Sequence, residues 1–109
     1  MTVLKHETLR SMASDSVTVD YEALGAALTE TPHIAMFVNG SDKAVLISFD
    51  GTNPHIHLVA GASATLDYGN SGALQQSTQI YVKLVAAGAA SAGALVTAML
   101  VVPKIKFGT

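Results

Sequence analysis

The chain alternates apolar and polar residues in short runs, a pattern that predicts β-strands rather than long helices. Val17, Val19 and Tyr21 fall on one face of the first run, and the polar residues between them fall on the other. This period of two is typical of a half-buried strand. Further strand-like runs occupy residues 33–39, 44–50, 55–60, 63–68, 79–86 and 94–102. With a loop or short edge strand at 22–32, about seven to eight short antiparallel strands are expected, an all-β fold of the β-sandwich or jelly-roll type.

Turn residues indicate which strands should be neighbours. Asn39-Gly40-Ser41-Asp42 separates the runs 33–39 and 44–50, and Asn and Gly tolerate the positive φ of a tight hairpin. We therefore expect these two runs to pair as an antiparallel hairpin. The runs 79–86 and 94–102 are expected to form a second hairpin around a loop of small residues. Because the run 94–102 is apolar on both faces, one face should pack internally and the other should lie under a sheet or a partner.

Length and composition indicate one folded domain with short extensions. The chain has 109 residues, of which 50% are apolar and 13% are charged, enough apolar material for a single core. We expect a β-sandwich domain at 16–102. Residues 1–15 end in small polar residues and are predicted to form an N-terminal arm, so deleting them should weaken assembly more than folding. Residues 103–109 begin at Pro103, which is expected to end the last strand, and are predicted to form a C-terminal tail.

Charge and cysteine content argue against several classes of partner. The formal net charge is −2 and the six Lys and Arg residues are scattered along the chain, so nucleic acid is not expected as a partner. The chain has no cysteine, which removes disulfides and thiolate chemistry from consideration. Residues 1–20 carry charges and contain no apolar stretch of signal-peptide length, so we expect the mature chain to start here.

One uncharged stretch, residues 84–102, is nominally long enough to cross a bilayer as a helix. Its centre consists of Ala, Gly and Ser, which gain little from lipid, and its ends are rich in β-branched residues. The hairpin is therefore the favoured interpretation and a membrane span the alternative. No membrane partner is expected.

The best candidate for metal binding is His55-Ile56-His57. Residues two apart in a strand point to the same face, so the two imidazoles could share a zinc or copper ion. Asp50, Asp67 and His33 do not make a credible third ligand on sequence grounds. We favour solvated or hydrogen-bonded histidines over a metal site or a pH-sensitive contact. The sequence leaves open whether either histidine has a role.

The turn at Asp50-Gly51-Thr52-Asn53 offers several oxygen donors, as the start of a calcium loop does. Pro54 follows where further ligands would be needed, and no distal glutamate lies at the required spacing. We therefore predict a turn that Asp50 caps rather than a calcium site.

Motifs for catalysis are missing from the sequence. The chain contains neither G-x-S-x-G nor a phosphate-binding glycine loop. Carboxylates for acid–base chemistry could come from Asp20, Glu22, Asp50 or Asp67, but a single sequence does not reveal whether any two converge. We predict a protein that is not an enzyme and has no catalytic, cofactor-binding or metal-binding residues. Its few aromatic residues fit core packing better than a glycan-binding platform.

The stretch from Phe37 to Lys83 carries an ordered set of turns and strand ends. It reads VNGSDKAVLISFDGTNPHIHLVAGASATLDY, then a polar loop, then STQIYVKLV. This order resembles small β-sandwich virion proteins of tailed bacteriophages. In those proteins an N-x-S-like turn leads to a strand ending in S-F/I-D-G, followed by a D-Y or D-L strand end and finally G-T-x-I/F-Y-V-K. The resemblance covers about half of the chain, and Ser77-Thr78 replaces the usual Gly-Thr.

The resemblance implies a structural component of the virion, assembled in the host cytoplasm. Its most specific form is a capsid cement or decoration protein that contacts the major capsid protein or other virion subunits. A head–tail connector or tail protein is the alternative, and a soluble glycan- or ligand-binding module is a more distant one. A small sandwich rich in Ala and Gly buries modest apolar area, and each Å² of apolar surface removed from water contributes only about 25 cal/mol. We therefore also expect a homo-oligomer, a dimer or trimer.

Overall fold

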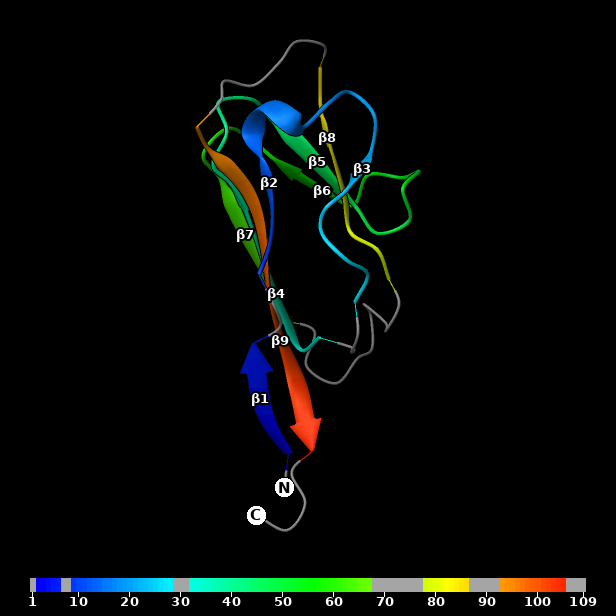
Figure 1. Ribbon diagram of the computed structural model, residues 1–109, viewed down its shortest axis with the longest axis vertical. Helices are drawn as coiled ribbons and strands as arrows, with labels where there is room; N and C mark the ends of the chain where they lie inside the picture. The colour runs from blue at the N-terminus through cyan, green and yellow to red at the C-terminus, as the bar shows by residue number, and fades with distance from the viewer. Residues whose placement is uncertain (1, 7–8, 29–31, 68–77, 87–92, 106–109) are drawn as a thin grey trace.

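The computed structural model describes residues 2–6, 9–28, 32–67, 78–86 and 93–105, and it confirms the all-β prediction. Two antiparallel sheets pack as a β-sandwich (Figure 1). The five-stranded sheet has the order β1-β9-β4-β7, with β2 also paired to β9, and the four-stranded sheet has the order β3-β8-β5-β6. The strands are β1 (Thr2–His6), β2 (Arg10–Ala13), β3 (Glu22–Ala23), β4 (Ile34–Asn39), β5 (Val45–Ser48), β6 (Ile56–Leu58), β7 (Ser63–Asp67), β8 (Tyr81–Leu84) and β9 (Leu95–Ile105), and a 3-10 turn spans Ser14–Ser16.

The core lies between the sheets and takes alternate residues of strands such as β4 and β8. Ala35 and Phe37 of β4 are fully buried, as are Val45 and Ile47 of β5. The remaining buried apolar residues are Val17, Leu24, Leu28, Leu58, Ile80, Val82, Leu84, Val96, Ala98 and Leu100. Each large apolar side chain removed from water contributes about 1.5–3 kcal/mol. The periodicity therefore places most strands correctly.

The first predicted hairpin is wrong, because β4 and β5 lie in different sheets. Asn39 is fully buried at the end of β4, and its Nδ2 donates hydrogen bonds to the carbonyls of Lys43, Leu58 and Val59 at 2.8–3.1 Å. Its Oδ1 accepts from the backbone N and the Oγ of Ser41 at 3.0 and 2.6 Å. The amide thus fills a buried corner where the chain crosses from one sheet to the other.

Gly40 serves this corner through its size rather than through positive φ. Its backbone N donates to the carbonyl of Leu95 at 3.0 Å, and a Cβ at position 40 would lie only 2.7 Å from that oxygen. The positive-φ glycines of the described chain are Gly25, Gly51, Gly61 and Gly93. The glycine predicted for a hairpin turn is required instead by a close backbone approach.

The second predicted hairpin is also wrong. β8 lies between β3 and β5 in one sheet, whereas β9 lies between β2 and β4 in the other. Both edges of β8 and both edges of β9 are therefore paired with other strands, which leaves no edge for a β8–β9 hairpin. The joining residues 87–92 lie outside the described part. One face of β9 does pack internally as predicted, through Val96, Ala98 and Leu100. No helix in the described ranges is long and apolar enough to cross a membrane.

The chain ends depart from the predicted arm and tail. Residues 10–13 pair with β9 as part of the sheet, and Arg10 and Ser14 are buried. β9 continues through Pro103 to Ile105 and pairs there with β1. Proline is tolerated at this point because the register with β4 ends at Val101, so β9 is an edge on that side among the residues that the structure describes.

The predicted strand at residues 16–21 is interrupted. Val17 is buried, but Val19 is 47% exposed although the pattern places both on one face. The Oγ1 of Thr18 lies 3.2 Å from both the backbone N and the O of Asp20. This local side-chain turn competes with a regular ladder, and the strand β3 begins only at Glu22.

The outer half of β9 and the strand β1 form a two-stranded ribbon. Thr2 pairs with Ile105, and the register runs inward to His6 and Val101. In Figure 1 the ribbon extends beyond the two layers along the long axis of the molecule. The extents of the molecule along its three principal axes are 53, 26 and 20 Å. The molecule is thus a sandwich with a protruding β-ribbon.

Candidate functional site

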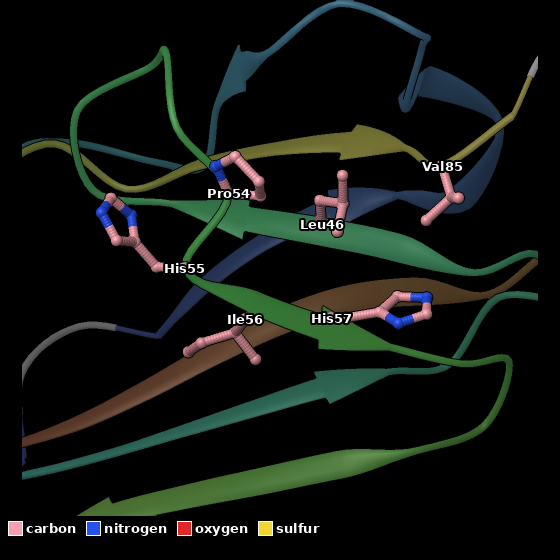
Figure 2. A pocket seen from close by; sticks show the side chains of 6 residues that line it. All are labelled: Leu46, Pro54, His55, Ile56, His57 and Val85. Atoms are coloured by element: carbon pink, nitrogen blue, oxygen red, sulfur yellow. The ribbon is translucent and has the colours of Figure 1, made fainter.

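A groove over β5 and β6 has a volume of about 360 Å³. Figure 2 shows its lining side chains, which come from the two strands, the loop before β6 and the residue after β8. They are Leu46, Pro54, His55, Ile56, His57 and Val85. The groove therefore has an apolar floor and two imidazoles among its walls.

His55 is held in one orientation by the loop that precedes it. Its Nδ1 accepts a hydrogen bond from the backbone N of Phe49 at 3.1 Å, and its ring stacks on that of Phe49 with centroids 5.3 Å apart and planes at 22°. The Phe49 ring in turn contacts the buried Phe37 ring at a centroid distance of 5.9 Å. An Nδ1 that accepts a hydrogen bond carries no proton, so the Nε2–H is the donor that remains.

His57 lies apart from His55, contrary to the geometry that a shared metal would need. β6 begins at Ile56, so His55 precedes the strand, whereas His57 pairs with Leu46 on the exposed face. Figure 2 shows the two rings at opposite ends of the groove. Among the described residues no group of three or more His, Cys, Asp or Glu side chains could hold a metal ion.

Asp50 caps the turn after β5, as the sequence predicts. Its Oδ1 accepts from the backbone N of Thr52 and of Asn53 at 2.8 Å and from the Oγ of Ser48 at 2.9 Å. Its Oδ2 accepts from Asn53 Nδ2 at 3.0 Å. These hydrogen bonds, led by those from the Asn53 and Thr52 backbone, lower the pKa of Asp50 well below its usual range. The carboxylate therefore organises the turn beside the groove.

A tyrosine and a lysine meet on the exposed face of the same sheet. The Nζ of Lys83 lies 4.8 Å from the centroid of the Tyr21 ring, within the range of a cation–π contact. The Tyr21 hydroxyl oxygen is shielded from solvent and has no hydrogen-bond partner among the described residues. Burial of this hydroxyl, followed by the negative charge of Asp50, raises the pKa of Tyr21.

The remaining candidate residues are dispersed over the fold. Asp20 and Glu22 are exposed along the β3 edge, while Asp67 ends β7 in the other sheet. His33 is half-buried, and its backbone N donates to the carbonyl of Val101 at 2.8 Å. The structure therefore does not gather the carboxylates of the sequence analysis into one cluster with His33.

Sequence reasoning missed the groove and the buried Arg10. The lining residues Leu46 and Val85 sit in predicted strands and give no local signal that they form a wall together. Arg10 counts as one scattered cation in the sequence, but its Nε and Nη2 donate to the carbonyls of Ala26 and Ala27. The signal in the sequence is the run of small residues at 25–27, which leaves space for a long side chain to pack against them.

The groove can bind an apolar group and offer imidazole donors to an acceptor at its rim. Both imidazoles are exposed, and Nδ1 of His55 is already occupied. Comparison with protein-family models, curated proteins and solved structures finds no match to this chain.

Proposed function

We propose that the protein is a non-enzymatic structural subunit that stabilises a larger particle through subunit contacts. Its most specific form is a cement or decoration protein on the capsid of a tailed bacteriophage, bound to the major capsid protein or to other virion subunits. A position in the head–tail connector or tail is the alternative within the same class.

The observation that carries the proposal is the protruding ribbon. Beyond Val101, β9 leaves the register of β4 and pairs with β1 in the described part of the chain. A two-stranded ribbon is marginally stable at best in water, because its backbone edges and faces lack neighbours. Open strand edges pair readily with another chain. A neighbouring subunit that adds a strand or covers the ribbon supplies the missing contacts.

The outer face of the five-stranded sheet supports the same proposal. Its central cross-strand pairs are Ile34–Val101, Met36–Met99 and Val38–Thr97. These six side chains are half-buried and carry no charge. Uncharged, mainly apolar sheet faces of this kind are typical of surfaces that pack against other proteins.

The virion assignment rests on the resemblance between residues 37–83 and phage β-sandwich proteins. The two-sheet fold is compatible with that class. Among the described residues the Asp50 carboxylate caps a turn and does not belong to a cluster of three or more metal-binding groups. On this proposal the protein assembles in the host cytoplasm and resides in the virion.

Deleting residues 2–6 tests the proposal, since it removes β1 and leaves β2 in place. We expect the variant to fold, with a melting temperature close to that of the wild type, but to lose incorporation into particles. The matched control is Thr65→Lys, an exposed change on β7. Normal incorporation of the deletion variant, or equal loss in the control, would count against the ribbon as the binding element.

A small-ligand binding module is the second candidate, favoured by the groove of about 360 Å³. Volumes of about 300–1,000 Å³ are usual for ligand sites. Thermal stabilisation of the isolated protein by a panel of glycans and small amphiphiles tests this candidate, because a ligand specific to the folded state raises the melting temperature. No shift across the panel argues against it.

A further inference from the structure

The ribbon formed by β1 and the outer half of β9 has two backbone edges. One belongs to β9 beyond Val101, where the register with β4 ends. The other belongs to β1, which is the outermost strand in the order β1-β9-β4-β7. An exposed strand edge presents N–H and C=O groups with which a further strand can pair. The residues along each edge determine which of the two can accept a strand.

The edge on β9 is interrupted by a proline. The carbonyl of Val101 accepts from the backbone N of His33 at 2.8 Å, so Val101 presents its backbone groups to the side of β4. Successive residues of a strand present these groups to alternate sides. Pro103 is therefore on the same side as Val101, beyond the last residue that pairs with β4. Since proline has no backbone N–H, this edge lacks the first donor that an added strand would need.

The edge on β1 keeps its donors. By the same alternation, Val102 and Lys104 present their backbone groups to β1, where they pair with Lys5 and Val3. The backbone groups of Lys5 and Val3 thus face β9. Those on the outer edge of β1 belong to Thr2, Leu4 and His6. None of these three residues is proline, so each offers both a donor and an acceptor.

We propose that β1 pairs with β1 of a second copy of the chain, antiparallel and about a two-fold axis at Leu4. Leu4 then exchanges two hydrogen bonds with Leu4 of the second copy, while Thr2 and His6 pair with His6 and Thr2. Every backbone group on the outer edge of β1 gains a partner. The two ribbons join into one four-stranded sheet, which is more stable than an isolated pair of strands. The contact is isologous, so it closes as a dimer.

The direction of β1 favours a second copy as the partner. Figure 1 shows β1 running from the tip of the ribbon toward the sandwich, and the ribbon extends beyond the two layers. An antiparallel copy therefore carries its own sandwich at the opposite end of the joined ribbons. The two strands have equal length, so all five residues of β1 are paired.

The charges along β1 favour the same register. With the axis at Leu4, Lys5 lies opposite Val3 of the second copy. An axis at Lys5 would instead set two like charges directly opposite each other, which destabilises a strand pair. This self-association goes beyond the proposed virion function and does not depend on it.

Sedimentation velocity of the full chain over a range of protein concentrations measures the dimer. Leu4→Pro removes the N–H at the proposed axis from both copies, whereas the pairing of β1 with β9 does not use that N–H. The matched control is Leu4→Val, which keeps the N–H and a residue that favours strands. We expect the control to dimerise in the concentration range of the wild type, and the proline variant to need at least about tenfold more protein. Circular dichroism checks that each variant folds.

Cysteine cross-linking tests the register, since the chain has no cysteine of its own. Leu4→Cys places the two new thiols on residues that pair at the axis, where Cα atoms lie about 5.5 Å apart, within the range for a disulfide. In the control Lys5→Cys the two new cysteines are diagonal neighbours about 7–8 Å apart, beyond that range. Under mild oxidation Leu4→Cys should therefore form the covalent dimer at least about tenfold faster, as measured on non-reducing gels.

A wild type that stays monomeric at every concentration, or a folded Leu4→Pro variant that associates as the wild type does, would overturn the inference. Cross-linking of Lys5→Cys as fast as that of Leu4→Cys would overturn it as well. If Leu4→Pro does not fold, the cross-linking comparison decides. All of these measurements use the isolated protein, so they are separate from particle incorporation, which tests the virion function.

Discussion

The aliphatic stem of Arg10 packs directly on Gly25. A Cβ at position 25 would lie 2.7 Å from Cγ of Arg10, and Gly25 has a φ of +70°. The guanidinium of Arg10 then donates to the carbonyls of Ala26 and Ala27 at 2.9 and 3.2 Å. This contact joins β2 to the segment that follows β3. It explains why residues 10–15 belong to the sandwich and do not form an arm.

Gly25→Ala should destabilise the protein by about 2–4 kcal/mol, because the new Cβ meets the Arg10 stem in addition to the cost of positive φ. The matched control is Gly61→Ala, which has a φ of +75° and nothing within 4 Å of its added Cβ. The control should lose only about 1–2 kcal/mol. Urea unfolding measures both, and equal losses would contradict the packing of Arg10 on Gly25.

Asn39→Ala should cost at least about 3 kcal/mol, since it leaves several buried donors and acceptors at the corner between the sheets unsatisfied. Asn39 contacts the Lys43, Leu58 and Val59 carbonyls and Ser41. Asn53→Ala removes an exposed amide contact to Asp50 and should cost less than about 1 kcal/mol. Chemical unfolding measures the loss of stability in the two variants. A loss for Asn39→Ala no larger than for Asn53→Ala would show that the corner between the sheets is solvated.

Tyr21→Phe should leave stability unchanged or raise it by up to about 1 kcal/mol, because the shielded hydroxyl has no partner among the described residues. The raised pKa of Tyr21 adds a dependence on pH. The unfolded state ionises first as pH rises past about 10, so stability is full below that pH and is lost above it. Thermal melts at neutral and alkaline pH should show a smaller alkaline loss in the variant. Marked destabilisation of the variant at neutral pH would reveal a bonded hydroxyl.

Asp50→Asn should remove part of the acid sensitivity of the fold. The folded-state pKa of Asp50 is lowered from the usual 3.8 by hydrogen bonds to its carboxylate. Its contribution is therefore complete above pH of about 4 and is lost as pH falls toward the folded value. Urea unfolding of the wild type should weaken across this range more than that of the variant. Asp15→Asn, an exposed change outside the turn, is the control and should keep the wild-type slope.

The sequence predicts where most strands lie, because short apolar runs bounded by turn residues mark them. Phe37 and Ile47 illustrate this, as both lie in predicted strands and are fully buried. Pairing is harder to predict. The turn at Asn39 meets the same local requirements in a hairpin and in a crossing between sheets, and the difference lies in the distant carbonyls of Leu58 and Val59 that its amide reaches.

In the candidate site, too, local contacts can be predicted from the sequence, whereas contacts between distant residues cannot. The turn at Asp50 is local in sequence, so its capping hydrogen bonds follow from the spacing of donors and acceptors. The relation between His55 and His57 depends on where β6 begins. One residue of difference, with the strand starting at Ile56, turns His55 toward Phe49 and separates the rings. The groove itself requires Leu46 and Val85 to come together from different strands, which no local pattern predicts.

A cryo-EM map of the parent particle tests the central claim most directly. If the protein is a structural subunit that binds through its ribbon, this chain occupies symmetry-related positions, with β1 and the outer half of β9 against a neighbouring subunit. Particles that lack the chain, or that hold it with the ribbon free in solvent, would contradict the account.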